Sequence, residues 1–342
     1  MPRVYFKPVK SHSGVEVVNG ASREVLTKLI EEENISLEKF IPLKVHMGEK
    51  GNRTYIKPEN FNSIIDYMEE KKINSSFIET NVLYRGQRMT REAHVKTGKE
   101  HGFTRIPIVI ADGENGEDFK NVIINKKHFK KCKIAKKIAD VNQLIVLSHF
   151  KGHILAGFGG AVKQLAMGCA ARGGKLDQHA NSKPIIIPFM CRTCGVCRTH
   201  CPVDAITIKK WAKIDKDICI GCSSCQAVCP HNAITSNWFQ TFSMSFNERL
   251  AEYALAAAKD KNNIYVSFAL DITAGCDCEG HPMIPINGDI GIFASTDPIA
   301  IDKACLDKLR PDVKLLFWRG IRTLTYGEKI GLGSKNYDLV NL

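Results

Sequence analysis

The stretch QLIVLSHFKGHILAGFGGAVKQLAMGC, residues 143–169, decides the fold expected for this chain. Its apolar beginning, rich in branched side chains, is typical of a buried β-strand. A glycine-rich turn follows it, and a helix is expected to begin near Gly160. A strand, a turn and a helix in this order indicate a parallel sheet covered by helices, where ligands bind beyond the carboxyl ends of the strands.

The same alternation continues on both sides of this stretch. Strands are expected within residues 40–47, 75–83, 105–112, 121–125, 263–272 and 289–295, and helices within residues 58–72, 90–102, 247–261 and 297–310. Asp297 followed by Pro298 is a good helix start, because the carboxylate caps free amides and proline suits the first turn. The sequence therefore predicts an α/β domain with a largely parallel sheet.

A cysteine-rich segment interrupts this pattern. CRTCGVCRTHCP (191–202) and CIGCSSCQAVCP (219–230) have identical cysteine and proline spacing, and the second begins 28 residues after the first. Each is followed by a similar short segment, VDAIT or HNAIT. We therefore expect an inserted, internally duplicated α+β domain over residues 184–235, which divides the α/β domain into residues 1–183 and 236–342.

This insert resembles bacterial-type ferredoxins with two 4Fe-4S clusters. In such a doubled motif, three closely spaced thiolates bind one cluster and the fourth cysteine, before the proline, binds the other. Structural zinc is disfavoured because zinc sites rarely use this doubled run. The predicted ligand sets are Cys191, Cys194, Cys197 and Cys229 for one cluster, and Cys219, Cys222, Cys225 and Cys201 for the second.

Length and composition agree with an ordinary globular protein. The chain has 342 residues, of which 44% are hydrophobic and 25% charged, enough for a substantial core. No apolar run approaches the ~20 residues that cross a bilayer, and the first ten residues do not resemble a secretory signal, so a cytoplasmic location with no membrane partner is expected. Eight of the thirteen cysteines are clustered, which favours metal binding over disulfides.

The chain is basic, with 48 lysines and arginines against 36 acidic residues. The densest basic run, KKHFKKCKIAKK (126–137), is interpreted as a solvated helix face. Nucleic-acid binding is not expected, because no recognised module or interleaving of aromatic and basic residues supports it. An acidic redox partner protein is preferred.

The two halves together resemble the iron–sulfur centre proteins known as domain of unknown function 362 (DUF362). The resemblance lies in SHFKGH, GFGGAVKQLAMGCAARGGK, CDCEG and DIGIFASTDPIAIDKACLD. It implies iron–sulfur redox chemistry but supplies no reaction.

The segment HILAGFGGAVK, with a histidine sixteen residues after its lysine, is also distantly similar to the signature of nickel-pincer lactate racemases. That resemblance implies that Lys163 carries a pincer cofactor, that His179 ligates nickel, and that His153 is an acid/base. It also places Arg53 near a substrate carboxylate. Gln87 stands where the second acid/base histidine belongs, and racemisation needs such a group on each face of the substrate carbon, so altered chemistry is expected.

The glycine-rich segment has other interpretations. A dinucleotide loop would need a third glycine where Val162 stands, and a P-loop would need Gly-Lys-Ser/Thr. The glycines could also simply let a helix pack closely on the sheet.

We predict instead that Gly157, Gly159 and Gly160 let the backbone approach a bound anion. The amides of the following helix would aim at that anion. His149 and His153 would enter the same cleft, and desolvation would lower the pKa of Lys163.

A Cys-x-Cys pair lies in DITAGCDCEGHP (271–282). Cys276 and Cys278 are close enough in sequence to share a metal ion or a redox change, with buried structural cysteines as the alternative. Cys169 and Cys305 are expected in the core.

Three functions are consistent with the sequence. The first is a redox enzyme whose clusters exchange electrons with a metal, cofactor or small-molecule substrate in the α/β cleft. The second is an electron-transfer protein without chemistry of its own, and the third is a factor that handles metals or sulfur during maturation of other proteins.

Overall fold

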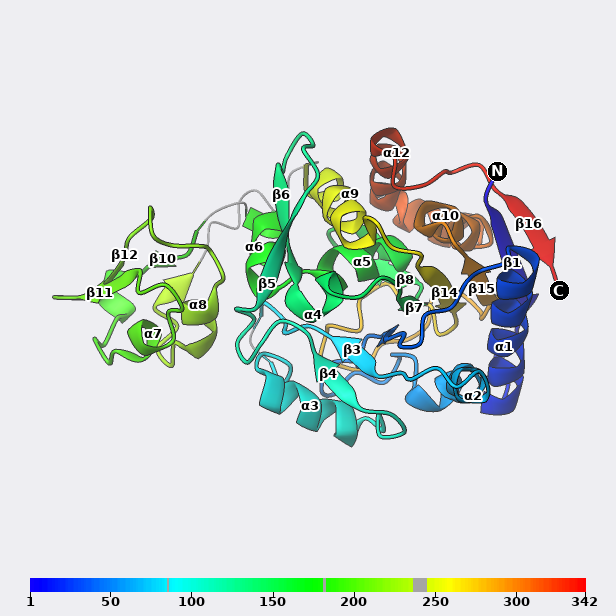
Figure 1. The fold of residues 1–342 in the computed structure, drawn as a ribbon, viewed down its shortest axis with the longest axis horizontal. Coiled ribbons are helices and arrows are strands. Elements are labelled where there is room, and N and C mark those ends of the chain that lie inside the picture. Colours follow the sequence, from blue (N-terminus) through cyan, green and yellow to red (C-terminus); the bar gives the residue numbers. More distant parts are fainter. Residues whose placement is uncertain (85, 181–182, 236–244) are drawn as a thin grey trace.

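The computed structural model describes residues 1–84, 86–180, 183–235 and 245–342 (Figure 1). Eight strands form one mixed sheet in the order β16-β1-β15-β14-β7-β2-β3-β4. Neighbouring strands are parallel except where β15 (Gly291–Ser295) pairs with β1 (Arg3–Pro8) and with β14 (Ile264–Ala269). The predicted α/β class with a mostly parallel sheet is confirmed.

The remaining strands and the helices have the following bounds. The main sheet also contains β2 (Leu43–Lys44), β3 (Phe77–Glu79), β4 (Ile108–Ile110), β7 (Ile145–His149) and β16 (Asp338–Asn341). Two hairpins of the α/β domain lie outside it, β5 (Phe119–Ile123) with β6 (Lys131–Ala135) and β8 (Lys151–His153) with β9 (Gly157–Gly159). The α/β helices are α1 (Val15–Glu32), η1 (Pro58–Phe61), α2 (Asn62–Glu70), α3 (Arg91–Glu100), α4 (Lys136–Ala139), α5 (Ala161–Cys169), α6 (Arg172–Ala180), α9 (Ser245–Ala258), α10 (Pro298–Asp307), α11 (Pro311–Leu316) and α12 (Trp318–Ile330).

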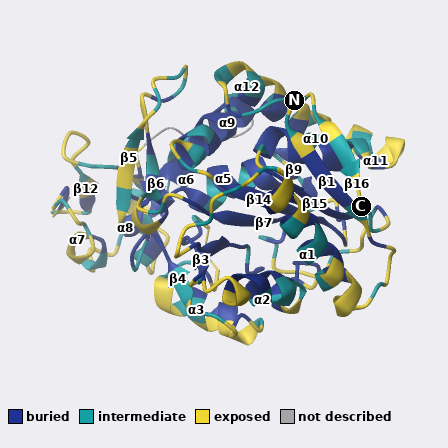
Figure 2. Ribbon diagram, turned by 45° about the vertical axis from the view of Figure 1, so that its right-hand side comes forward, coloured by how far each residue is buried: buried dark blue, intermediate teal, exposed yellow. Residues whose placement is uncertain are grey.

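Helices cover both faces of the sheet, and each face has its own core. On one face α5, α9 and α10 pack against the strands, and on the other α1 and α2 do so (Figure 1). Along β7, Ile145 and Leu147 point into one core and Val146 into the other. Because neighbouring side chains of a strand face opposite ways, a central strand must be apolar throughout. Figure 2 shows β7 and β14 buried along their length.

The expected start of α10 is confirmed. The Asp297 carboxylate accepts hydrogen bonds from the amides of Ile299 and Ala300, at 2.8 and 2.9 Å, and Pro298 occupies the first turn. Within the described residues, no helix combines the length and apolar composition needed to cross a membrane.

The basic run at 126–137 is not a helix face, contrary to the expectation from sequence. Residues 131–135 form β6, in which Cys132 and Ile134 are buried while Lys131 is exposed. This alternation has the two-residue period of a strand, which the density of lysines hid. The partner strand β5, which corresponds to the strand expected at 121–125, lies in this hairpin and not in the main sheet.

The cysteine-rich insert forms a separate lobe at the left of Figure 1. It contains β10 (Ile185–Ile186), η2 (Pro188–Met190), α7 (Val196–Thr199), β11 (Ile206–Ile208), β12 (Ala212–Ile214), α8 (Ser224–Val228) and β13 (Ile234–Thr235). The first and last strands, β10 and β13, pair with each other, so the chain enters and leaves the lobe side by side. Ile206 and Ile234, which are 28 residues apart, belong to one small core.

Candidate functional site

The eight clustered cysteines of the insert fall into two groups in space. Each group of four thiols lines its own small cavity. One group is Cys191, Cys194, Cys197 and Cys229, and the other is Cys201, Cys219, Cys222 and Cys225. The two groups in space have the same members as the two ligand sets expected from the duplicated motif. In both, the fourth cysteine of each run belongs with the first three cysteines of the other run.

The backbone around the thiols repeats with the same 28-residue period. Three pairs of positions adopt left-handed φ angles in both halves, namely Thr193 and Gly221, Gly195 and Ser223, and Asp204 and Asn232. Such turns direct backbone N–H groups inward, where they form anion-binding concavities. The amides of Ala212, Ala205 and Gly221 accordingly donate to the sulfur atoms of Cys191, Cys201 and Cys219, at 3.3–3.4 Å.

A larger cavity of about 330 Å³ lies at the carboxyl edge of the parallel strands. His46 follows β2, Thr80 follows β3, and Lys151 follows β7, and all three line it. This is the edge at which open α/β sheets bind ligands, and the volume is within the range of small-molecule pockets.

Most of the site residues expected from sequence share this cavity. His149, His153, Lys163, His179 and Cys278 line it, together with Gly159 and Gly160. Arg53 and Gly157 are not among its lining residues, and the side chain of Arg53 is exposed. The structure therefore does not bring Arg53 to the site.

Two of the three glycines are required by packing within the protein. A Cβ atom at Gly157, where φ is +87°, would lie 2.3 Å from the amide nitrogen of Gly320 in α12. A Cβ atom at Gly160 would lie 2.2 Å from the Asp302 carboxylate. Of the three, Gly159 faces the lysines of the cavity, Lys151 and Lys163.

The first amides of α5 are not available to a ligand. Ala161 and Val162 donate to the Asp302 carboxylate at 2.7 and 3.0 Å. The predicted use of this helix end to bind an anion is therefore wrong, because a buried carboxylate of the chain already occupies the position.

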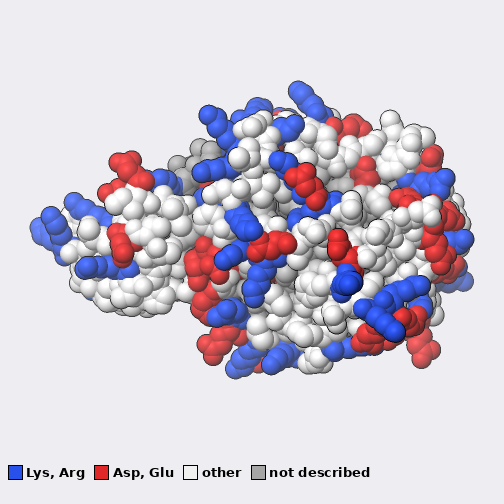
Figure 3. Space-filling view, in the orientation of Figure 1, with Lys and Arg blue, Asp and Glu red and all other residues white. Residues whose placement is uncertain are grey.

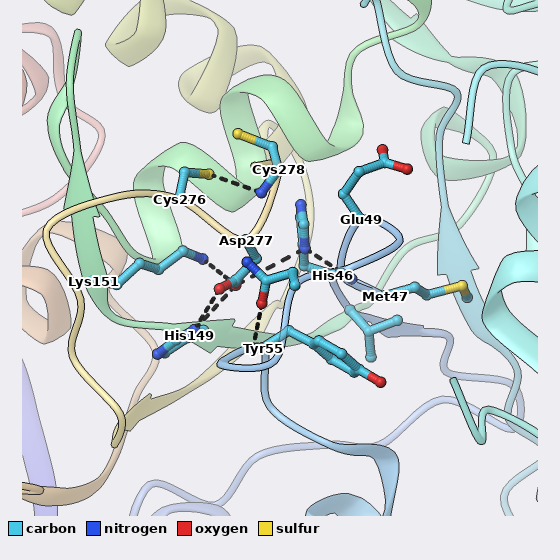
Figure 4. Close-up of polar contacts among 12 residues, drawn as sticks. His46, Met47, Glu49, Tyr55, His149, Lys151, Cys276, Asp277 and Cys278 are labelled. Atoms are coloured by element: carbon cyan, nitrogen blue, oxygen red, sulfur yellow. Dashed lines mark hydrogen bonds and ion pairs between the residues drawn. The ribbon is translucent and has the colours of Figure 1, made fainter. Parts of the chain in front are cut away.

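Cys276 and Lys163 are direct neighbours. Lys163 Nζ donates to Cys276 Sγ at 3.5 Å. The Cys278 amide donates to the same sulfur at 3.5 Å (Figure 4). A hydrogen bond from the Cys278 side chain and the charges of Lys163 and Lys151 hold the pKa of Cys276 well below its usual range, despite burial. The opposite change is seen for Cys278, whose pKa is raised by its hydrogen bond with Cys276 and by burial.

The expected lowering of the pKa of Lys163 is not found. Burial alone would lower this pKa, but the Cys276 and Cys278 thiols beside the amine raise it above its ordinary value. Lys163 is therefore an ammonium ion that stabilises a thiolate.

Two of the four histidines that line the cavity, His153 and His179, are neutral. Burial and the Lys163 charge lower the pKa of His153 well below its usual range and that of His179 to about 4. His153 Nδ1 accepts hydrogen bonds from the amides of Leu155 and Ala156, at 3.3 and 3.0 Å. The ring hydrogen of a neutral His153 is therefore on Nε2.

A buried ion cluster lies beneath the thiols (Figure 4). The Asp277 carboxylate, which is fully buried, lies 2.8 Å from Lys151 Nζ and 3.0 Å from His149 Nδ1. His149 Nε2 lies 2.8 Å from the Leu270 carbonyl oxygen. Both ring nitrogens thus face acceptors within the protein. His149 thereby holds the side chain of Asp277, which stands between the two cysteines in the sequence.

Sequence reasoning missed His46, Arg88 and Lys151, and noted Asp277 only as a neighbour of the cysteine pair. Arg88 is 1% exposed, with its Nε 3.3 Å from a Glu49 oxygen and its Nη1 3.4 Å from His46 Nε2. Arg88 follows Gln87 within GQRMT, and Asp277 separates the two cysteines of CDC, so both motifs carried a usable signal. His46 carries no local signal, because only the sheet topology brings it to this edge, whereas Lys151 lies within SHFKGH directly after the expected strand.

Helix α6 connects the insert to the cavity. Near its start, a Cβ atom at Gly173 would lie 2.3 Å from the Gly221 carbonyl oxygen and 2.9 Å from Cys222 Cα. Near its end, His179 lines the cavity, as Lys175 does between them. The six residue-to-residue steps from Gly173 to His179 span about 9 Å at the rise of an α-helix. The group formed by Cys201, Cys219, Cys222 and Cys225 is therefore separated from the cavity by the length of one short helix, α6.

Comparison with solved structures shows distant likenesses. A Thermotoga maritima protein solved by the Northeast Structural Genomics Consortium has a TM-score of 0.45 and 8% identity, over 94% of this chain and 60% of that one. The lactate racemase apoprotein of Thermoanaerobacterium thermosaccharolyticum has a TM-score of 0.43 and 13% identity, over 89% of this chain and 56% of that one. The chain thus spans less than two thirds of either protein.

Comparison with curated proteins gives no match. The family model for the domain of unknown function DUF362 matches residues 41–307, which include the whole insert, the cavity-lining histidines and the Cys-x-Cys pair. The chain therefore belongs to the DUF362 family.

Proposed function

We propose that this protein is an iron–sulfur redox protein whose two 4Fe-4S clusters exchange electrons with a small-molecule substrate or cofactor in the α/β cavity. The observation that carries the proposal is the close contact of Gly173 with Gly221 and Cys222. Through this contact, one set of four cysteines packs against α6, the helix that reaches the cavity. Each cluster, when bound, supplies one-electron storage at a potential set by its surroundings.

The residues of the insert fit such clusters. Each cavity is lined by four thiols, and backbone amides donate to three of the sulfurs, which is how proteins stabilise a reduced, more negative cluster. A single structural zinc ion would also need four thiolates, but the doubled motif shares its fourth cysteines between sites as ferredoxins do.

Anaerobically purified protein should contain about eight irons and eight sulfides per chain, with a visible absorption band that bleaches on reduction. The Cys201→Ser variant should damage the cluster bound mainly by residues 219–225, because Cys201 lines that cavity. Metal and sulfide analysis with electron paramagnetic resonance checks this. Damage to the cluster of residues 191–197 instead would contradict the ligand assignment.

A second candidate is a nickel-pincer-like cofactor held by Lys163 and His179, possible because both line one cavity with His153. Lys163 would carry the group and the neutral ring of His179 would ligate its metal. Mass spectrometry of the Lys163 peptide should then show an adduct, and His179→Ala should lose a bound metal other than cluster iron. An unmodified lysine and no such metal would remove this candidate.

We also propose an acidic redox partner. The surface seen in Figure 3 intersperses charges of both signs, with lysines and arginines at the outer tip of the insert. A partner that docks there would reach the clusters without crossing the α/β domain. A protein whose clusters exchange electrons only with such a partner would be an electron carrier. Transfer of a labile metal to a client would indicate a maturation factor.

A further inference from the structure

We propose that Cys276 and Cys278 form a redox-active dithiol, which takes two electrons from the clusters and passes them to a low-molecular-weight disulfide in the cavity. This inference rests on the proposed function, because the clusters supply the electrons. It assigns the electron acceptor of the α/β domain to a pair of its own thiols.

The two sulfurs are placed to form and break a bond. Cys276 Sγ, Cys278 Sγ and a ring nitrogen of His153 all lie within 4.8 Å of one another. A disulfide needs sulfurs about 2.05 Å apart. Residues 276–278 belong to no helix or strand, so side-chain rotation and a small adjustment of the turn can close that gap.

The two cysteines have different environments, and these define their roles. Cys276 is 1% exposed and accepts hydrogen bonds from Lys163 Nζ and the Cys278 amide, so its thiolate is stabilised. Cys278 lines the cavity. In the disulfide, Cys278 is the sulfur that an incoming thiolate can reach, and Cys276 is the better leaving group.

The same geometry disfavours a metal ion bound by these thiols and His153. A metal on Nδ1 of His153 would displace the two amides that donate there, and a metal on Nε2 would require loss of the ring proton. Lys163 and Lys151 also place positive charge beside the thiols, which attracts a thiolate and repels a divalent cation. A dithiol is therefore the better assignment.

The chemistry balances as follows. Cys278 gives its proton to the Cys276 thiolate and attacks the substrate disulfide, which forms a mixed disulfide and releases one thiolate. That thiolate takes the proton from Cys276, whose sulfur then attacks Cys278 Sγ and releases the second thiolate. The two clusters return the Cys276–Cys278 disulfide to one thiolate and one thiol by giving one electron each, with one proton from water.

The experiment uses anaerobic holoprotein, reduced with dithionite, freed of reductant, and mixed with bis(2-hydroxyethyl) disulfide. The cluster absorption should recover, with one disulfide consumed per two electrons, and the peptide carrying Cys276 and Cys278 should become 2 Da lighter. Cys276→Ser and Cys278→Ser should each slow recovery at least about 100-fold, as expected when a reacting group is removed, with unchanged iron content. Cys305→Ala, at a buried thiol in α10, is the matched control and should recover at the rate of the unmodified protein.

Each other outcome has a distinct meaning. If the clusters reduce normally but Cys278→Ser recovers as fast as the unmodified protein, the dithiol is wrong and the proposed function stands. A metal other than cluster iron that is lost in both serine variants would show that the thiols are ligands, and would overturn the dithiol. Absence of iron and sulfide from protein whose thiols still form the lighter peptide would contradict the proposed function and the clusters as electron source, but not the dithiol pair itself.

Discussion

The Asp277→Asn variant is expected to lose about 3–5 kcal/mol of its free energy of unfolding, the cost of removing one partner from a buried ion pair. Asp277 is fully buried and faces Lys151 at 2.8 Å and His149 at 3.0 Å. Asparagine has the same shape but no charge, so the buried Lys151 ammonium loses its carboxylate partner. Urea unfolding of the anaerobic protein at neutral pH measures the loss.

The pH dependence gives a second measurement of the same effect. Burial alone would raise the pKa of Asp277, but His149 and Lys151 lower it well below its usual range. The carboxylate therefore contributes its stability in full above its unfolded pKa of about 3.9, and loses it as pH falls through the lower folded pKa. The free energy of unfolding of Asp277→Asn should therefore differ least from that of the unmodified protein at the acid end of the pH range.

An exposed ion pair provides the control. Asp66 pairs with Arg105, and their side chains are 47% and 33% exposed. Asp66→Asn should cost at most about 1 kcal/mol. The interpretation of Asp277 would be contradicted by equal losses in the two variants. A Lys151→Met and Asp277→Asn double variant that loses less than the sum of the single variants would support it.

The sheet was predictable because its central strands are apolar throughout and are separated by helices with clear boundaries. The sequence analysis identified β7 and β14 for this reason, and Asp297 for its cap. It did not identify β1, β16, α1 or α12, although β1 and β16 pair at the sheet edge where the two termini meet (Figure 1). The edge strand β16 is half-exposed and carries a weaker pattern, and β6 was obscured by its exposed lysines.

The candidate site was predictable only where residues are close in sequence. His153 and Lys163 lie within one motif and do share a cavity. The neighbours that decide their protonation come from other elements. Lys163 meets Cys276 across 113 positions, and the α5 amides meet Asp302 across 140. No local pattern contains these pairs, so the expected pKa of Lys163 and the expected anion site at α5 were both wrong.

The two clusters are expected to differ in their importance for the cavity. Dithionite is small and reduces each cluster directly. If the cluster far from α6 is lost, bis(2-hydroxyethyl) disulfide should therefore still restore part of the cluster absorption. Loss of the cluster beside α6 should slow this recovery to the rate of the Cys278→Ser variant. Cys194→Ser and Cys222→Ser make this comparison, and each should retain about four irons.

If one of these serine variants lost both clusters, the comparison would fail. A variant that keeps all eight cluster ligands avoids this problem. A Cβ atom at Gly173 would lie 2.3 Å from the Gly221 carbonyl oxygen, so Gly173→Ala must separate α6 from the insert without removing a thiol. It should keep about eight irons and still slow recovery. Gly20→Ala in α1, where nothing lies within 4 Å of the added carbon, is the matched control and should change neither. Gly173 lies against Gly221 and Cys222, and Cys222 belongs to the second set of four cysteines. If Cys194→Ser and Cys222→Ser slowed recovery equally and Gly173→Ala recovered at the full rate, electrons would reach the cavity by another route.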